Sequence, residues 1–239
     1  MDKTVPAGAA LLLDFIYRTD AGKAPPDCYQ VIFGNRQNRL AKPITQMTLG
    51  DLIVAQKNWS SKTWVKANWG YNTASSAAGA AQFMRATLQD LSRELGLKGT
   101  QVFDANFQDR LAFLLLKRRG YEDFMAGKIN RTEFGKRLAQ EWASFPVLAA
   151  VQGAHRKLKR GETYYAGDEL NKALVKPEAI EALLDKVKAA GNAVTPSPIA
   201  QSDEPEAPSS PETAVTAQVS TNFWADLFKA ILSFFGKAA

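Results

Sequence analysis

The sequence predicts a mostly α-helical protein with a small β region, followed by a disordered linker and a separate amphipathic helix at the C-terminal end. Apolar residues recur at spacings of three and four through most of the first 190 residues. One short alternating, β-branched run, CYQVIF at 28–33, supplies the β signal. Prolines 196, 198, 205, 208 and 211, set among Ser, Thr, Ala and acidic residues, mark the linker.

The first elements follow from local patterns. Apolar residues at helical spacing predict a helix over 7–18, and the Gly, Pro and Asp content of 19–27 predicts a loop. The run 28–33 is predicted to be a short strand. Thr48 with an acid three positions later is a helix-capping pattern, which opens a helix that runs to about residue 57.

The segment 59–71 is rich in Trp and Lys. Trp59, Trp64 and Trp69 are five residues apart, which is neither a helical nor a strand period, so this segment is predicted to be irregular. Its aromatics could roof the core, or they could form a wall on which sugars or bases stack.

The remaining ordered part is helical. Gly96, Gly120 and Pro146 each follow or break a helical pattern. The predicted helices span 79–95, 106–119, 122–126, 130–144 with a Thr132 cap, and 177–190 with Pro at its first turn.

A run of very small residues, SSAAGAA at 75–81, precedes Gln82, Phe83 and Met84. Small side chains let backbone approach closely, either for a tight helix–helix contact or for a flat polymer beside the amide of Gln82.

Composition limits the chemistry. The single cysteine, Cys28, excludes an intramolecular disulfide framework, and the single histidine, His155, argues against a His-based metal site or a Ser–His triad. We therefore predict no metal and no cofactor. The net charge of +6 suits an acidic partner. Basic residues are scattered and no recognition motif occurs, so no nucleic acid is expected.

The termini carry two further predictions. The apolar run 7–13 is cut by Asp14, so the N-terminal end is not a convincing export signal. Residues 223–237 would span only about 22 Å as a helix, too short to cross a bilayer, and read as an interfacial helix. Alternatively this helix docks on the main domain or on another copy. The predicted membrane-contacting residues are Phe223, Trp224, Leu227, Phe228, Ile231, Phe234 and Phe235.

Six short pieces of the sequence occur in the order, and near the spacing, of one known family. They are YQVIFG at 29–34, SAAG with QF between 76 and 83, LGL at 95–97, QD at 108–109, RG at 119–120 and WASFP at 142–146. Together they resemble the lambda-type phage lysozymes over roughly residues 9–150. The resemblance implies an α+β lysozyme-like fold.

On this resemblance the chain divides into four parts. A lysozyme-like catalytic domain covers 1–175, an accessory helix 176–191, a Pro-rich linker 192–222 and the amphipathic helix 223–239.

The resemblance also implies an activity. Enzymes of this branch cut the glycan strand of peptidoglycan between N-acetylmuramic acid and N-acetylglucosamine, as a muramidase or as a lytic transglycosylase that leaves a 1,6-anhydro sugar. Such an endolysin needs no signal peptide: it stays in the host cytoplasm and acts in the periplasm after a holin opens the membrane. A monomer is expected.

The family places a catalytic Glu just after the first helix, and this sequence departs from that pattern. One register puts Tyr17 at the position, and a second makes Asp20 the acid at the helix exit. We prefer Asp20 as general acid and base, because Tyr cannot replace a carboxylic acid here. Asp is one methylene shorter than Glu, so slow catalysis is expected. Asp20 could instead be a turn residue that bonds its own backbone.

The other site predictions follow from the motifs. Tyr29 and Gln82 are expected to hold acetamido or hydroxyl groups of the sugars, Ser76 to position the cleft backbone, and Phe83 to lie beneath the site. Trp142 is expected to belong to the core rather than to contact ligand. Ala80 and Ala81 stand where the family carries Arg and Tyr, which removes polar contacts.

Two competing functions remain open. A lysozyme fold with a spoiled acid could only bind peptidoglycan or membrane, for example as a virion component. A membrane-binding module could also act mainly through 223–237, with the globular part as carrier.

Overall fold

The structure, a computed structural model, describes residues 1–168 and 171–191 of the 239-residue chain. This part is mostly helical with one small two-stranded sheet, which confirms the predicted fold class. Its α-helices are α1 (Ala7–Asp20), α2 (Leu49–Trp59), α3 (Lys62–Trp69), α4 (Arg85–Glu94), α5 (Ala105–Arg118), α6 (Tyr121–Met125), α7 (Arg131–Glu141) and α8 (Pro177–Ala190).

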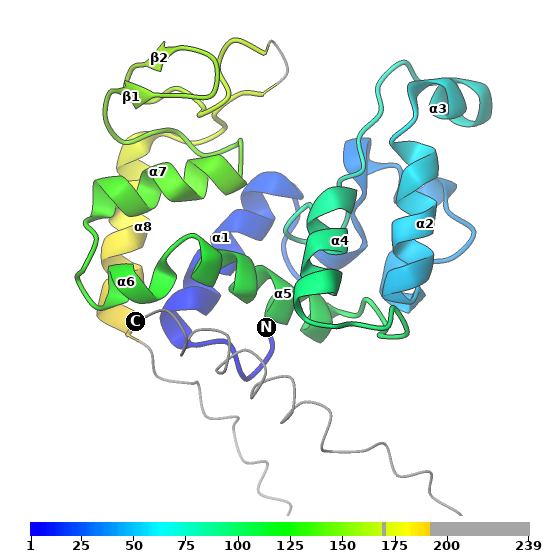
Figure 1. The fold of residues 1–239 in the computed structure, drawn as a ribbon, viewed down its shortest axis with the longest axis horizontal. Coiled ribbons are helices and arrows are strands. Elements are labelled where there is room, and N and C mark those ends of the chain that lie inside the picture. Colours follow the sequence, from blue (N-terminus) through cyan, green and yellow to red (C-terminus); the bar gives the residue numbers. More distant parts are fainter. Residues whose placement is uncertain (169–170, 192–239) are drawn as a thin grey trace, which may run out of the picture.

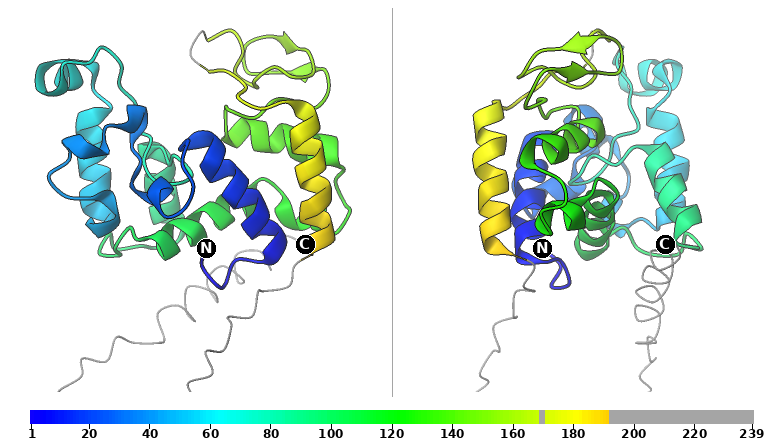
Figure 2. Two further views of the ribbon diagram at one scale, coloured as in Figure 1. Left: turned by 180° about the vertical axis from the view of Figure 1, so that it is seen from behind. Right: turned by 60° about the vertical axis from the view of Figure 1, so that its left-hand side comes forward.

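The helices form two lobes on either side of a central gap. Helices α2, α3 and α4 lie on one side, and α1, α6, α7 and α8 lie on the other, with α5 running beneath both (Figure 1). Seen from behind, α1 lies in the middle of the molecule with α8 beside it (Figure 2). Buried apolar side chains from both lobes belong to one hydrophobic cluster.

Helix α1 is the central element of the larger lobe. Its apolar face is buried, and Leu12, Leu13 and Ile16 are fully inaccessible. Helix α8 packs against it so closely that a Cβ at Gly8 would lie 2.6 Å from the carbonyl oxygen of Val187. The predicted accessory helix is thus an integral part of this lobe.

The β region lies elsewhere than predicted. Residues 28–33 form no strand: they begin with a 3-10 turn, Asp27–Gln30, and continue through an isolated bridge between Ile32 and Ala78. The sheet is instead the antiparallel pair β1 (Val151–Gln152) and β2 (Lys157–Leu158). The apolar residues of this run are buried without forming a strand. Val31 and Ile32 lie against the hairpin described below.

The Trp- and Lys-rich segment is also helical, contrary to the prediction. Ser61 caps α3, and Gly70 ends it at φ 78°. The five-residue spacing of the tryptophans reflects the break between α2 and α3. Trp59 is buried, while Trp64 and Trp69 pack edge-to-face at 5.1 Å and lie against the core. This placement indicates that the three tryptophans cover the core and favours this role over a surface on which sugars or bases stack.

Two other predicted helix boundaries hold, and one predicted cap is wrong. The backbone N–H of Asp51 donates to Thr48 Oγ1 at 3.2 Å, which confirms the capping pattern of α2. Gly96 follows α4 with φ 60°. Helix α7 is capped by Asn130 rather than by Thr132, because the Asn130 side chain accepts from the N–H of Glu133 at 2.9 Å.

Residues 75–84 form a tight hairpin, so α4 begins at Arg85 rather than near residue 79. Ala78 pairs with Phe83, and the turn between them uses positive φ at Gly79 (76°) and Gln82 (48°). These angles are incompatible with a continuing helix. The small side chains therefore serve a close backbone approach, as the sequence indicated, but in a turn rather than a helix.

Three buried side chains, one from each neighbouring element, satisfy the backbone of this hairpin. Gln56 of α2 donates to the carbonyl oxygens of Ser76 and Phe83 at 2.6 and 3.0 Å. Gln108 of α5 accepts from the N–H of Ala80 at 2.9 Å, and Trp142 donates to the carbonyl oxygen of Ala81 at 3.3 Å. The hairpin is thereby fixed to both lobes.

Within the described ranges, no helix combines the length and the apolar character needed to cross a bilayer. The predicted linker at 192–222 and the predicted membrane-contacting helix, from Phe223 to Phe235, lie outside the described residues.

Candidate active site

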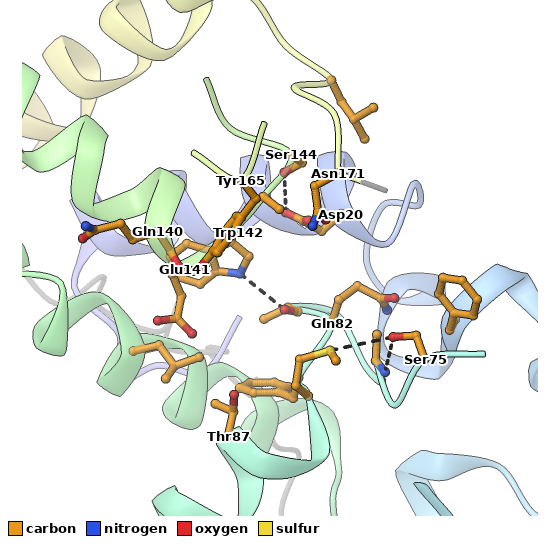
Figure 3. Close-up of a pocket in the computed structure, with 18 of the residues that line it drawn as sticks. Asp20, Ser75, Gln82, Thr87, Gln140, Glu141, Trp142, Ser144, Tyr165 and Asn171 are labelled. Atoms are coloured by element: carbon orange, nitrogen blue, oxygen red, sulfur yellow. Dashed lines mark hydrogen bonds between the residues drawn. The ribbon is translucent and has the colours of Figure 1, made fainter. Parts of the chain in front are cut away.

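A cavity of about 760 Å³ opens between the two lobes. Its walls come from the end of α1, the hairpin 75–84, the start of α4, the end of α5, and the segment that follows α7 (Figure 3). Polar and aromatic residues that line it include Asp20, Ser75, Gln82, Thr87, Arg119, Gln140, Glu141, Trp142, Ser144, Tyr165 and Asn171.

Asp20 reaches this cavity because it is the last residue of α1, at the point where the helix leaves the core. Its carboxylate accepts a hydrogen bond from the Ser144 hydroxyl at 2.9 Å, which crosses from the segment after α7 (Figure 3). The carboxyl therefore bonds across the cavity wall and not to its own turn.

Tyr17, the residue at the Glu position in the other register, lies elsewhere. Its ring is fully buried, and its hydroxyl donates to Asp109 of α5 at 2.8 Å. Of the two registers considered, only the one with Asp20 brings a carboxyl into the cavity.

The environment of Asp20 raises its pKa to about 7. Burial is the larger cause, because it disfavours the charged form, and the hydrogen bond from Ser144 opposes it by stabilising the carboxylate. A carboxylic acid with a pKa near neutrality can both give and accept a proton at physiological pH.

Gln82 and Phe83 line the same cavity as Asp20. The Gln82 side-chain nitrogen donates to the carbonyl oxygen of Gly79 at 2.8 Å and to that of Val31 at 3.3 Å. These bonds fix the amide within the hairpin. Gln82 also holds φ at 48°, a conformation that non-glycine residues rarely adopt and that is concentrated at functional sites.

Tyr29 and Ser76 do not line the cavity. Tyr29 is buried, and its hydroxyl donates to Asp109 at 3.0 Å, in the same network as Tyr17. Ser76 is buried too, and its hydroxyl accepts from the N–H of Arg85 at the start of α4. Tyr29 therefore has a structural role instead of the predicted sugar contact. Ser76 bonds the backbone at the start of α4, and Ser75 occupies the cavity wall.

Sequence reasoning missed one wall of the cavity. Glu141 and Arg119 line it and form an ion pair at 2.7 Å. Trp142 is buried as expected, yet it also faces the cavity, and in the view of Figure 3 it lies between Asp20 and Glu141. The RG and WASFP motifs were the available signal, because they contain Arg119, Trp142 and Ser144.

The single cysteine, Cys28, does not line the cavity. Cys28 is buried, and burial raises the pKa of its thiol to about 12. Across residues 1–168 and 171–191, no group of three or more His, Cys, Asp or Glu side chains could hold a metal ion.

Comparison with known proteins identifies a family. A family model described as Endolysin matches residues 19–167, a range that begins beside Asp20 and contains every residue named in the cavity wall except Asn171. No curated protein matches significantly. No solved structure matches significantly either.

Proposed function

Because the chain belongs to the Endolysin family, and is thus a phage enzyme that degrades the bacterial cell wall, we propose a specific reaction. The protein cleaves the glycan strand of peptidoglycan, with Asp20 as general acid and base. The bond is the β-1,4 bond between N-acetylmuramic acid and N-acetylglucosamine. This combines the family's substrate with the resemblance of the sequence motifs to lambda-type lysozymes.

One observation carries the proposal: the Asp20 carboxyl lies on the wall of a 760 Å³ cavity, where burial raises its pKa to about 7. Glycosidic cleavage needs an acid that is still protonated near neutral pH and that becomes a base once it has given up its proton. A carboxyl in bulk solvent would be ionised at that pH.

The chemistry is a proton transfer followed by bond exchange at one carbon. Asp20 gives its proton to the glycosidic oxygen, the C1–O bond breaks with its electrons going to that oxygen, and positive charge develops at C1. The Asp20 carboxylate then takes a proton from the incoming hydroxyl, whose oxygen bonds to C1. The incoming group is the sugar's own 6-hydroxyl in a transglycosylase, or water in a muramidase.

Gln82 and the Arg119–Glu141 pair are polar groups on the cavity wall. In this proposal they orient the sugars, while Ser144 holds the Asp20 carboxyl in position.

The enzyme would act in the periplasm after release from the host cytoplasm through a holin-opened membrane. Membrane contact through 223–237 remains a prediction that concerns residues outside the described part.

Mass spectrometry of fragments released from purified sacculi tests the bond. Cleavage as proposed gives fragments that end in muramic acid, and a mass one water lower than the reducing sugar identifies the 1,6-anhydro product. Intact glycan strands with newly freed peptide ends would contradict the proposal, because the bond cut would then be an amide.

A further inference from the structure

The net positive charge of this protein arises in residues 28–89, because acidic residues are scarce there. Residues 28–89 contain seven Lys and Arg against a single acid, Asp51, whereas the rest of the chain contains 23 basic and 23 acidic residues. The net charge of +6 is therefore the net charge of this one region. Such a field attracts acidic partners to one side of the cavity.

A second concavity lies within that region. A pocket of about 480 Å³ is lined by Lys62, Thr63, Lys66, Ala67 and Asn72, on one face of α3 and just beyond its end. Lys62 and Lys66 are exposed, four residues apart on the same helix face, and form no ion pair with any residue that the structure describes. Two like charges at this spacing repel each other unless an anion lies between them.

The pocket is connected to the active-site cavity by a short, fixed segment. Asn72 lines the basic pocket and Ser75 lines the cavity, and three residues span at most about 11 Å. Arg36 clamps this segment: its guanidinium donates to the carbonyl oxygen of Thr73 at 2.7 Å and lies 4.0 Å from the ring centroid of Tyr71. Asn72 and Ser75, which line the two concavities, therefore lie within about 11 Å of each other.

We propose that the α3 pocket, through Lys62, Lys66 and Asn72, binds the carboxylates of the peptide stems that project from the peptidoglycan strand held in the cavity. The inference rests on the proposed function, because it takes the glycan strand as the polymer in the cavity. The stems carry free carboxylates, and the lysine ammonium groups offer three donors each. The pocket thus selects peptide-bearing strands over bare glycan.

The test compares two substrates and two variants of the full-length chain. The substrates are purified sacculi and the same glycan strands after an amidase has removed the peptide stems. The variants are K62E/K66E and the matched control K98E/K186E, which makes the same change in net charge at exposed lysines that line neither pocket. Sacculus binding is measured by co-sedimentation, and KM and kcat are measured separately.

We expect K62E/K66E to raise KM for sacculi about fivefold to tenfold, because two exposed charge contacts are lost. Its kcat should change little. It cleaves stem-free strands as the wild type does, and K98E/K186E behaves as the wild type on both substrates. An equal loss on both substrates, or an equal loss in the control variant, would overturn the inference.

Two further outcomes are informative. If the wild type releases no glycan fragments from either substrate, the proposed glycosidase activity fails, while weaker co-sedimentation of K62E/K66E with sacculi but not with stem-free strands would still support the pocket. Binding of anionic phospholipid vesicles that K62E/K66E abolishes, with sacculus binding unchanged, would assign the pocket to a lipid surface and overturn the inference.

Discussion

At the scale of single residues, hydrogen-bond partners and access to the cavity distinguish Asp20 from the other buried carboxyl, Asp109. Asp20 and Asp109 are both carboxyls whose pKa burial raises, but their partners differ. Asp109 accepts hydrogen bonds from Tyr17, from Tyr29 and from the N–H of Asp2, and lies away from the cavity lining. Asp20 has one hydroxyl partner and opens onto the cavity.

Tyr29 provides a direct test of this separation. We expect Tyr29→Phe to lower the free energy of unfolding by about 1 kcal/mol, because Asp109 loses a buried hydrogen bond, and to leave kcat/KM nearly unchanged. Denaturant unfolding and sacculus cleavage measure the two effects.

Gln82→Gly is the matched comparison. It removes a cavity side chain but relieves the positive φ, so activity falls while stability stays within about 1 kcal/mol of the wild type. A large activity loss in Tyr29→Phe would restore that residue as a sugar contact.

The sequence indicated Asp20 and Gln82 as site residues from local signals, the exit of the first helix for Asp20 and the preceding run of small residues for Gln82. Tyr29 was misplaced because the partner of its hydroxyl, Asp109, lies 80 residues away in the sequence. A pattern within 29–34 carries no information about that partner.

At the scale of elements, the hairpin 75–84 decides the shape of the site. Gly79 packs directly on α5: a Cβ there would lie 2.3 Å from Gln108 Oε1 and 3.0 Å from the Phe103 ring. The same glutamine donates to the carbonyl oxygens of Tyr29 and Phe103, so it cannot move aside without losing both bonds.

Gly79→Ala should therefore destabilise the protein by more than its backbone angle alone explains. Gly70 is the control, because it has nearly the same φ (78° against 76°) and no atom near its Cβ position. We expect about 1 kcal/mol for Gly70→Ala and about 3 kcal/mol for Gly79→Ala, measured by urea unfolding. Equal losses at the two positions would show that the close approach to Gln108 does not contribute.

Helices with a clear apolar period were predictable from the sequence, whereas the start of α4 was not. α1, α5 and α8 follow local periodicity and capping, so their extents match the sequence patterns to within a few residues. The predicted start of α4 was wrong because alanine favours helix, while Gln56, Gln108 and Trp142 hold the backbone in a turn. Tertiary hydrogen bonds overrode local propensity.

At the scale of the whole molecule, the two lobes divide the work. The lobe with α1 and α7 supplies Asp20, its Ser144 partner and the Arg119–Glu141 pair. The lobe with α2, α3 and α4 supplies the hairpin and the net positive charge. The cavity lies where these lobes meet, so it depends on residues that are far apart in the sequence.

The most direct test of the account is the pH dependence of sacculus cleavage by the wild type and by Asp20→Asn, measured from about pH 4 to about pH 9. The wild-type rate should fall as the pH rises through about 7, because Asp20 must be protonated to act as the acid. The variant should remain folded, cleave at least about 100-fold more slowly and lose that decline. A folded Asp20→Asn protein that keeps more than about a tenth of the wild-type rate with the same decline would contradict the assignment of Asp20 as the acid.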